Sequence, residues 1–96
     1  MCIRLRTELE NRLENLTVVL YGHENQVDEI KMISASLDVL LIKLMQNNCL
    51  SENQENELRL LINELNLSIF LENINRVKET FTQERIKQIW IMTETK

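Results

Sequence analysis

The sequence predicts an all-α protein, either a long helical hairpin or a four-helix bundle, with coiled-coil-like packing that is completed by oligomerisation. One glycine and no proline occur in 96 residues, where average usage is about 7% and 5%. Leu, Ile, Glu, Asn, Lys and Arg dominate, and apolar residues recur at alternating spacings of three and four. A chain of this length forms one domain, expected to span residues 1–96, with a limited core of its own.

The first predicted arm covers about residues 3–47. Its apolar residues follow a heptad repeat, with Leu13, Leu20, Val27 and Leu41 at a and Leu9, Leu16, Ile30, Leu37 and Leu44 at d. The repeat keeps its phase across Gly22, which favours a continuous or kinked helix over a break at 22–24. His23 and Ser34 then fall on seam positions, where we expect a polar layer that sets register. The alternative is that Gly22 ends a first helix, because glycine costs about 1 kcal/mol inside a helix and is common just after one.

The second predicted arm covers about residues 52–92. Ser51 and Gln54 match a capping box, in which each side chain bonds the backbone amide of the other residue. A second candidate break lies at 80–82, and breaks in both arms would produce four helices. Residues 58–71 carry two apolar stripes, so this stretch needs neighbours on two faces. The stripes are Leu58, Ile62, Leu65 and Ile69, and Leu67, Phe70, Ile74, Val77 and Phe81.

Charge and hydropathy argue against several classes of function. The net charge is −4, with both signs mixed along the chain, so we expect no direct nucleic-acid binding. The apolar runs are shorter than the 18 or so residues of a membrane span. Glu8 and Glu10 interrupt any N-terminal signal, so we expect a cytoplasmic protein. In that reducing compartment Cys2 and Cys49 are expected to be two free thiols, with one disulfide as the alternative.

No residue pattern indicates catalysis, a metal or a cofactor. His23, Glu24 and Asp28 are spaced to share neighbouring helical turns, but a metal site usually needs three or four converging ligands, and no second histidine or nearby cysteine exists. The carboxylates recur every few residues, as expected for a solvated helix face. We therefore expect a protein that is not an enzyme and holds no metal or cofactor.

The C-terminal residues Phe81, Ile86, Ile89 and Trp90 are the predicted partner-binding site. Ile86, Ile89 and Trp90 lie at i, i+3 and i+4 on one helix face, and tryptophan is enriched at binding hot spots. The alternative is that this segment packs on the protein's own helices.

These features predict a non-enzymatic protein–protein interaction module, a small helical adaptor or assembly subunit that acts through helix–helix docking. Its expected partners are protein, in a homo-oligomer such as a dimer or in a bundle with another chain. The alternative is a stoichiometric inhibitor or regulator, of the phage, virus or antitoxin-like kind, whose acidic surface covers a basic site on a target protein.

Overall fold

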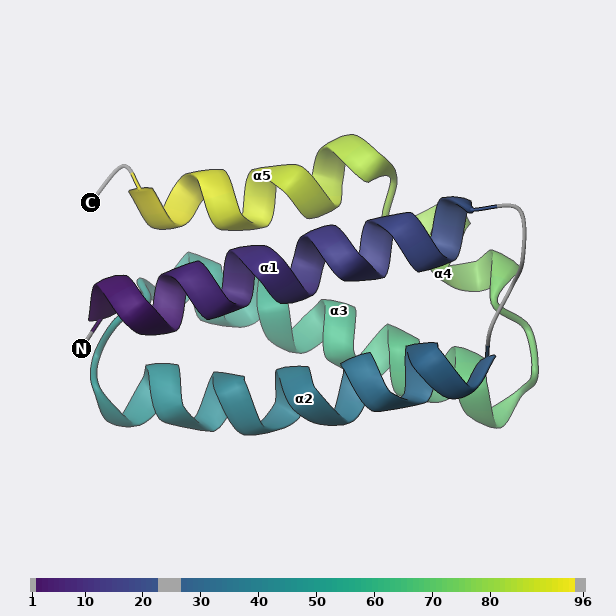
Figure 1. Cartoon of the computed structure of the whole chain (residues 1–96), viewed down its shortest axis with the longest axis horizontal. Helices are drawn as coiled ribbons and strands as arrows, with labels where there is room; N and C mark the ends of the chain where they lie inside the picture. The colour runs from purple at the N-terminus through teal and green to yellow at the C-terminus, as the bar shows by residue number, and fades with distance from the viewer. Residues whose placement is uncertain (1, 23–26, 95–96) are drawn as a thin grey trace.

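The computed structural model describes residues 2–22 and 27–94, and these residues form five helices and no strand. The prediction of an all-α protein is confirmed. The helices are α1 (Cys2–Tyr21), α2 (Val27–Gln46), α3 (Glu52–Phe70), α4 (Asn75–Thr80) and α5 (Gln83–Glu94). The chain runs up and down, so that α1 is antiparallel to both α2 and α5 (Figure 1). Helix α1 packs on α2 and α5, α2 packs on α3, and α3 packs on α4 and α5.

The first arm is two helices. Helix α1 ends at Tyr21 and α2 begins at Val27, so the favoured continuous helix over about 3–47 is wrong and the alternative break at Gly22 is present. The heptad phase survives the break because Leu20 and Ile30, on either side of it, are both buried in the same core. A heptad repeat that keeps its phase therefore indicates that the residues face one core. It does not show that the helix is continuous. His23 lies outside the described residues.

The second arm begins as predicted. The amide of Gln54 donates to Ser51 Oγ at 3.3 Å, and the amide of Ser51 donates to Gln54 Oε1 at 2.7 Å, which is the reciprocal pair of a capping box. The candidate break at 80–82 is present, because α4 ends at Thr80 and α5 begins at Gln83. A further break separates α3 from α4, where Glu72 adopts a positive φ of 55°.

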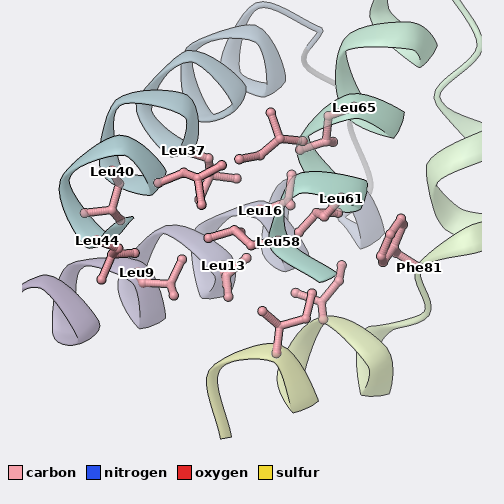
Figure 2. Packing of buried hydrophobic residues seen from close by; sticks show 14 of the residues in the cluster. Leu9, Leu13, Leu16, Leu37, Leu40, Leu44, Leu58, Leu61, Leu65 and Phe81 are labelled. Atoms are coloured by element: carbon pink, nitrogen blue, oxygen red, sulfur yellow. The ribbon is translucent and has the colours of Figure 1, made fainter. Parts of the chain in front are cut away.

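One cluster of buried side chains joins all five helices (Figure 2). Most of the predicted seam belongs to it: Leu9, Leu13, Leu16, Leu20, Ile30, Leu37, Leu41 and Leu44 are buried, whereas Val27 is exposed. From the second arm come Leu58, Leu61, Ile62, Leu65, Ile74, Val77 and Phe81. Both arms therefore turn their seams toward one another within a single chain. The second predicted stripe is divided, because Leu67 and Phe70 are exposed whereas Ile74, Val77 and Phe81 lie in the core.

Gly22 follows α1 without adopting a positive φ, so its role is one of space. A Cβ atom at this position would lie 2.7 Å from the backbone oxygen of Val18. We expect Gly22→Ala to destabilise the protein by about 1 kcal/mol or more, since the end of α1 must shift to admit the methyl group. Thermal unfolding followed by circular dichroism measures the change. A higher melting temperature would instead show that α1 continues through this position.

Candidate interaction surface

The C-terminal residues predicted to bind a partner lie mostly in the protein's own core. Phe81, Ile86 and Ile89 are each at most 2% exposed, so in this structure their side chains are closed to any partner, which corrects the sequence-based assignment. The physical reason is that α5 packs on α1 and α3, and so covers the apolar face that the sequence left unassigned. Trp90 lies in α5, but its side chain is outside the described part of the structure.

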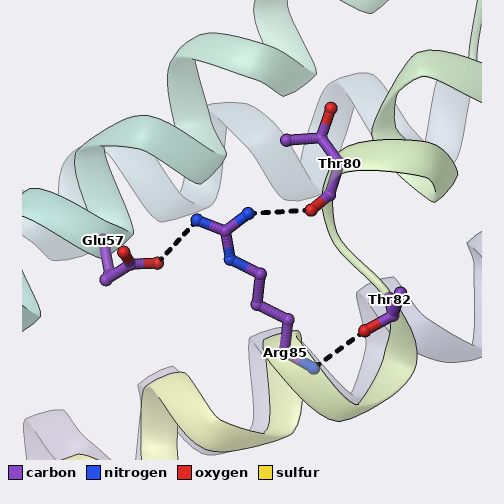
Figure 3. A network of polar contacts seen from close by, with 4 residues as sticks. All are labelled: Glu57, Thr80, Thr82 and Arg85. Carbon is purple, nitrogen blue, oxygen red and sulfur yellow. Dashed lines mark hydrogen bonds and ion pairs between the residues drawn. The ribbon is translucent and has the colours of Figure 1, made fainter.

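Arg85 fixes where α5 begins (Figure 3). Its guanidinium donates to Glu57 Oε2 on α3 at 3.2 Å and to the Thr80 carbonyl oxygen at 2.9 Å, while its amide donates to Thr82 Oγ1 at 3.2 Å. The guanidinium also lies 4.4 Å from the centroid of the Phe81 ring. One arginine thus joins α3, the α4–α5 turn and the first turn of α5, and α5 is held against the core.

Tyr21 performs a similar role from the end of α1. Its hydroxyl donates to the carbonyl oxygen of Phe81 at 2.9 Å, with the carbonyl oxygen of Lys78 at 3.4 Å. Partial burial raises the pKa of this hydroxyl above its ordinary value of 10.0. The last residue of α1 is therefore tied to the turn that separates α4 from α5.

The raised pKa of Tyr21 predicts a pH dependence of stability. Because the unfolded tyrosine releases its proton first, the stabilisation is complete below about pH 10 and is lost as the pH rises through the folded-state pKa. Tyr21→Phe should cost about 1 kcal/mol at neutral pH by removing the hydrogen bond, and should lose less stability than the wild type between about pH 9 and 12. Urea unfolding of both proteins tests this, and equal losses would show that Tyr21 does not titrate differently on unfolding.

Ser34 is a buried polar residue between α2 and α3. Its hydroxyl donates to Asn66 Oδ1 on α3 at 2.7 Å, and only 1% of the residue is exposed. The heptad position of Ser34 correctly predicted a polar residue in the core. Its partner Asn66 was not predicted. Heptad spacing does not show how one helix is aligned along another, so it cannot pair residues across two helices. Whether this pair sets register stays a prediction.

Cys2 and Cys49 form a disulfide, so the expectation of two free thiols is wrong. Their Cα atoms lie 5.4 Å apart although 47 positions separate them in the sequence. Helices α1 and α2 are both 20 residues long and antiparallel, which brings the start of α1 beside the turn after α2. The Arg6 guanidinium donates to the Cys49 carbonyl oxygen at 3.1 Å and reinforces the same junction.

Reduction of this disulfide should lower the thermal stability substantially. Closing a loop of this length stabilises a protein by about 2 to 4 kcal/mol, which corresponds to a fall in melting temperature of at least about 8 °C on reduction. Thermal unfolding with and without dithiothreitol measures the fall. The variant with both Cys2→Ser and Cys49→Ser is the control, and its melting temperature should not respond to the reductant. A wild-type melting temperature that also ignores the reductant would contradict the bond.

The outer faces of α1, α2 and α3 expose large apolar side chains. Phe70 is 82% exposed, Met32 72%, Val18 66% and Val39 54%. The others that are exposed are Ile3, Val27, Ile42, Leu60, Leu67 and Leu71. Scattered apolar residues are normal on a surface, whereas contiguous ones mark an interaction site. Val18 and Met32 line one surface hollow together, and Val39 lines a second one.

These three residues line an open groove between α1 and α2, which we call the α1/α2 groove. One hollow of about 300 Å³ is lined by Glu8, Arg12, Ser36, Val39, Leu40 and Lys43. A second hollow of about 350 Å³ is lined by Asn15, Val18, Val19, Glu29, Met32 and Ile33. On each helix the lining residues recur every three or four positions, with a few adjacent pairs such as Met32 and Ile33, so the two hollows lie along one face. Arg12 Nε donates to Ser36 Oγ across the groove at 2.6 Å.

The α1/α2 groove is lined by residues of α1 and α2 alone. In Figure 1, α3 passes behind α1 and α2, and no described helix lies in front of them. This face was not predicted as an interaction site. The apolar residues that broaden the seam between Met32 and Met45 suggested only that this stretch packs against residues 58–71.

Metal-ligand clusters and membrane spans are absent from the described residues. Within 2–22 and 27–94, no three His, Cys, Asp or Glu side chains gather as metal ligands would. Over the same residues, every helix is too short or too polar to cross a membrane. Comparison of the chain with protein families, curated proteins and solved structures found no match.

Proposed function

We propose that this protein is a non-enzymatic interaction module, a small adaptor or assembly subunit that docks helices of another protein chain. Its helices would then extend into a larger helical bundle, with the coiled-coil-like packing and oligomerisation that the sequence predicts. The observation that supports this proposal is the exposure of large apolar side chains along the α1/α2 groove.

The groove suits a helix because of its shape and its chemistry. Met32 and Val39 present apolar surface two helical turns apart on α2, and Val18 adds to it from α1. An amphipathic helix binds an apolar groove through residues at i, i+3, i+4 and i+7. Lys43 at one end and Glu29 at the other supply polar groups beyond the apolar residues, as in the polar rim of a protein interface.

Two matched surface variants test the docking function. Met32→Asp places a charge on the groove, and Asn56→Asp adds the same charge at an exposed position on α3. After gentle purification from cells that produce the protein naturally, light scattering should show the wild type in a complex, either with itself or with another protein. Met32→Asp should weaken that complex by about thirtyfold, the scale of a binding hot spot, while Asn56→Asp should leave it intact. A wild type that is monomeric and unaccompanied would contradict the proposal.

The second candidate function, stoichiometric inhibition of a basic target, is favoured by a different surface. Glu10 and Glu14 line an open cleft between α1 and α5, together with a single cation, Lys87. Binding through such carboxylates weakens steeply as salt screens the charges, whereas apolar docking persists. Complex formation in about 50 mM and about 500 mM salt therefore separates the two functions.

A further inference from the structure

The outer face of α2 carries a second heptad seam, separate from the buried one. Its members in the α1/α2 groove are Glu29, Met32, Ser36, Val39 and Lys43, which follow one another at intervals of three and four. Glu29 and Lys43 lie seven residues on either side of Ser36, so the seam has a small residue at its centre and opposite charges at its two ends.

We propose that this seam binds a second copy of the chain, with α2 of one copy antiparallel to α2 of the other and Ser36 at the crossing point. The inference rests on the proposed docking function and names its partner. In this arrangement Glu29 of each copy faces Lys43 of the second copy. Each copy's Met32, at 72% exposed, meets the second copy's Val39, at 54% exposed.

Charge complementarity selects both the partner and the orientation. A symmetric dimer through one face has its two-fold axis in the interface, either along the groove or across it. An axis along the groove would place Lys43 against Lys43 and Glu29 against Glu29. An axis across the groove at Ser36 places Lys43 against Glu29 twice, so the groove is complementary to itself in this orientation alone.

Helix α1 adds charged groups to the same groove. Glu8 lines the hollow at the Lys43 end, whereas Arg12 bonds Ser36 at the centre of the seam. The charged group lining the other end is Glu29, beside the apolar Val18 and Val19 of α1. The Lys43 end of one copy thus faces the Glu29 end of the second, and the apolar part of α1 widens the surface that is buried.

Two single charge reversals test the proposal on the purified full chain. Glu29→Lys and Lys43→Glu each turn two attractive pairs of the dimer into two repulsive ones, and should each raise the dissociation constant by about tenfold or more. Mixing the two variants should restore tight association. One copy then carries lysine at both positions and the other carries glutamate at both, so each facing pair is again attractive. Sedimentation equilibrium in low salt measures all three, and thermal unfolding confirms that each variant is folded.

Two further variants act on matched apolar positions. Met32→Asp should abolish the dimer, and Phe70→Asp, on the exposed face of α3, should leave it unchanged. A wild type that stays monomeric up to about 1 mM overturns the inference. So do charge reversals without effect, which would indicate the other two-fold axis or another face. If the purified wild type is monomeric but binds a different protein, and Met32→Asp weakens that binding, the dimer inference fails and the docking function stands.

Discussion

Burial of the leucine seam is the interaction on which the rest of the structure depends. Leu9, Leu13 and Leu16 on α1 meet Leu37 and Leu44 on α2, with α3 and α5 completing the enclosure (Figure 2). A chain of 96 residues has limited apolar surface to bury, so the helices must cover one another's seams. The antiparallel course of α1, α2 and α3 follows from this need, because short connections can return each helix along its predecessor.

Antiparallel helices of equal length bring their ends together, and polar and covalent contacts then hold those ends. At one end of the molecule the disulfide and Arg6 join the start of α1 to the turn after α2. At the other end Tyr21 binds the turn before α5, and Arg85 ties that turn to α3. These contacts act at the junctions, where the apolar seam itself cannot specify where a helix ends.

The sequence predicted what depends on local chemistry. The heptad spacing identified most of the buried leucines of α1 and α2, and Ser51 with Gln54 located the start of α3 within one residue. The favoured prediction from the sequence did not have α2 fold back on α1. The heptad repeat has the same phase in a hairpin of two helices as in one long helix, so it does not distinguish them. The break after Phe70 was missed because residues 71–74 contain neither glycine nor proline. The cysteine pairing and the burial of Ile86 and Ile89 depend on which helices become neighbours, which spacing along one helix does not encode.

The central claim is that the first arm folds back within one chain, which buries the inner seam and leaves Met32 and Val39 on the outer face of α2 exposed. Mass spectrometry of peptides from unreduced protein tests it most directly, after labelled and unlabelled chains have been mixed and refolded together. The structure predicts a Cys2–Cys49 link within single chains, because their Cα atoms are 5.4 Å apart. A continuous helix would separate them by about 70 Å at 1.5 Å per residue. Links only between labelled and unlabelled chains, or two free thiols under oxidising conditions, would contradict the fold.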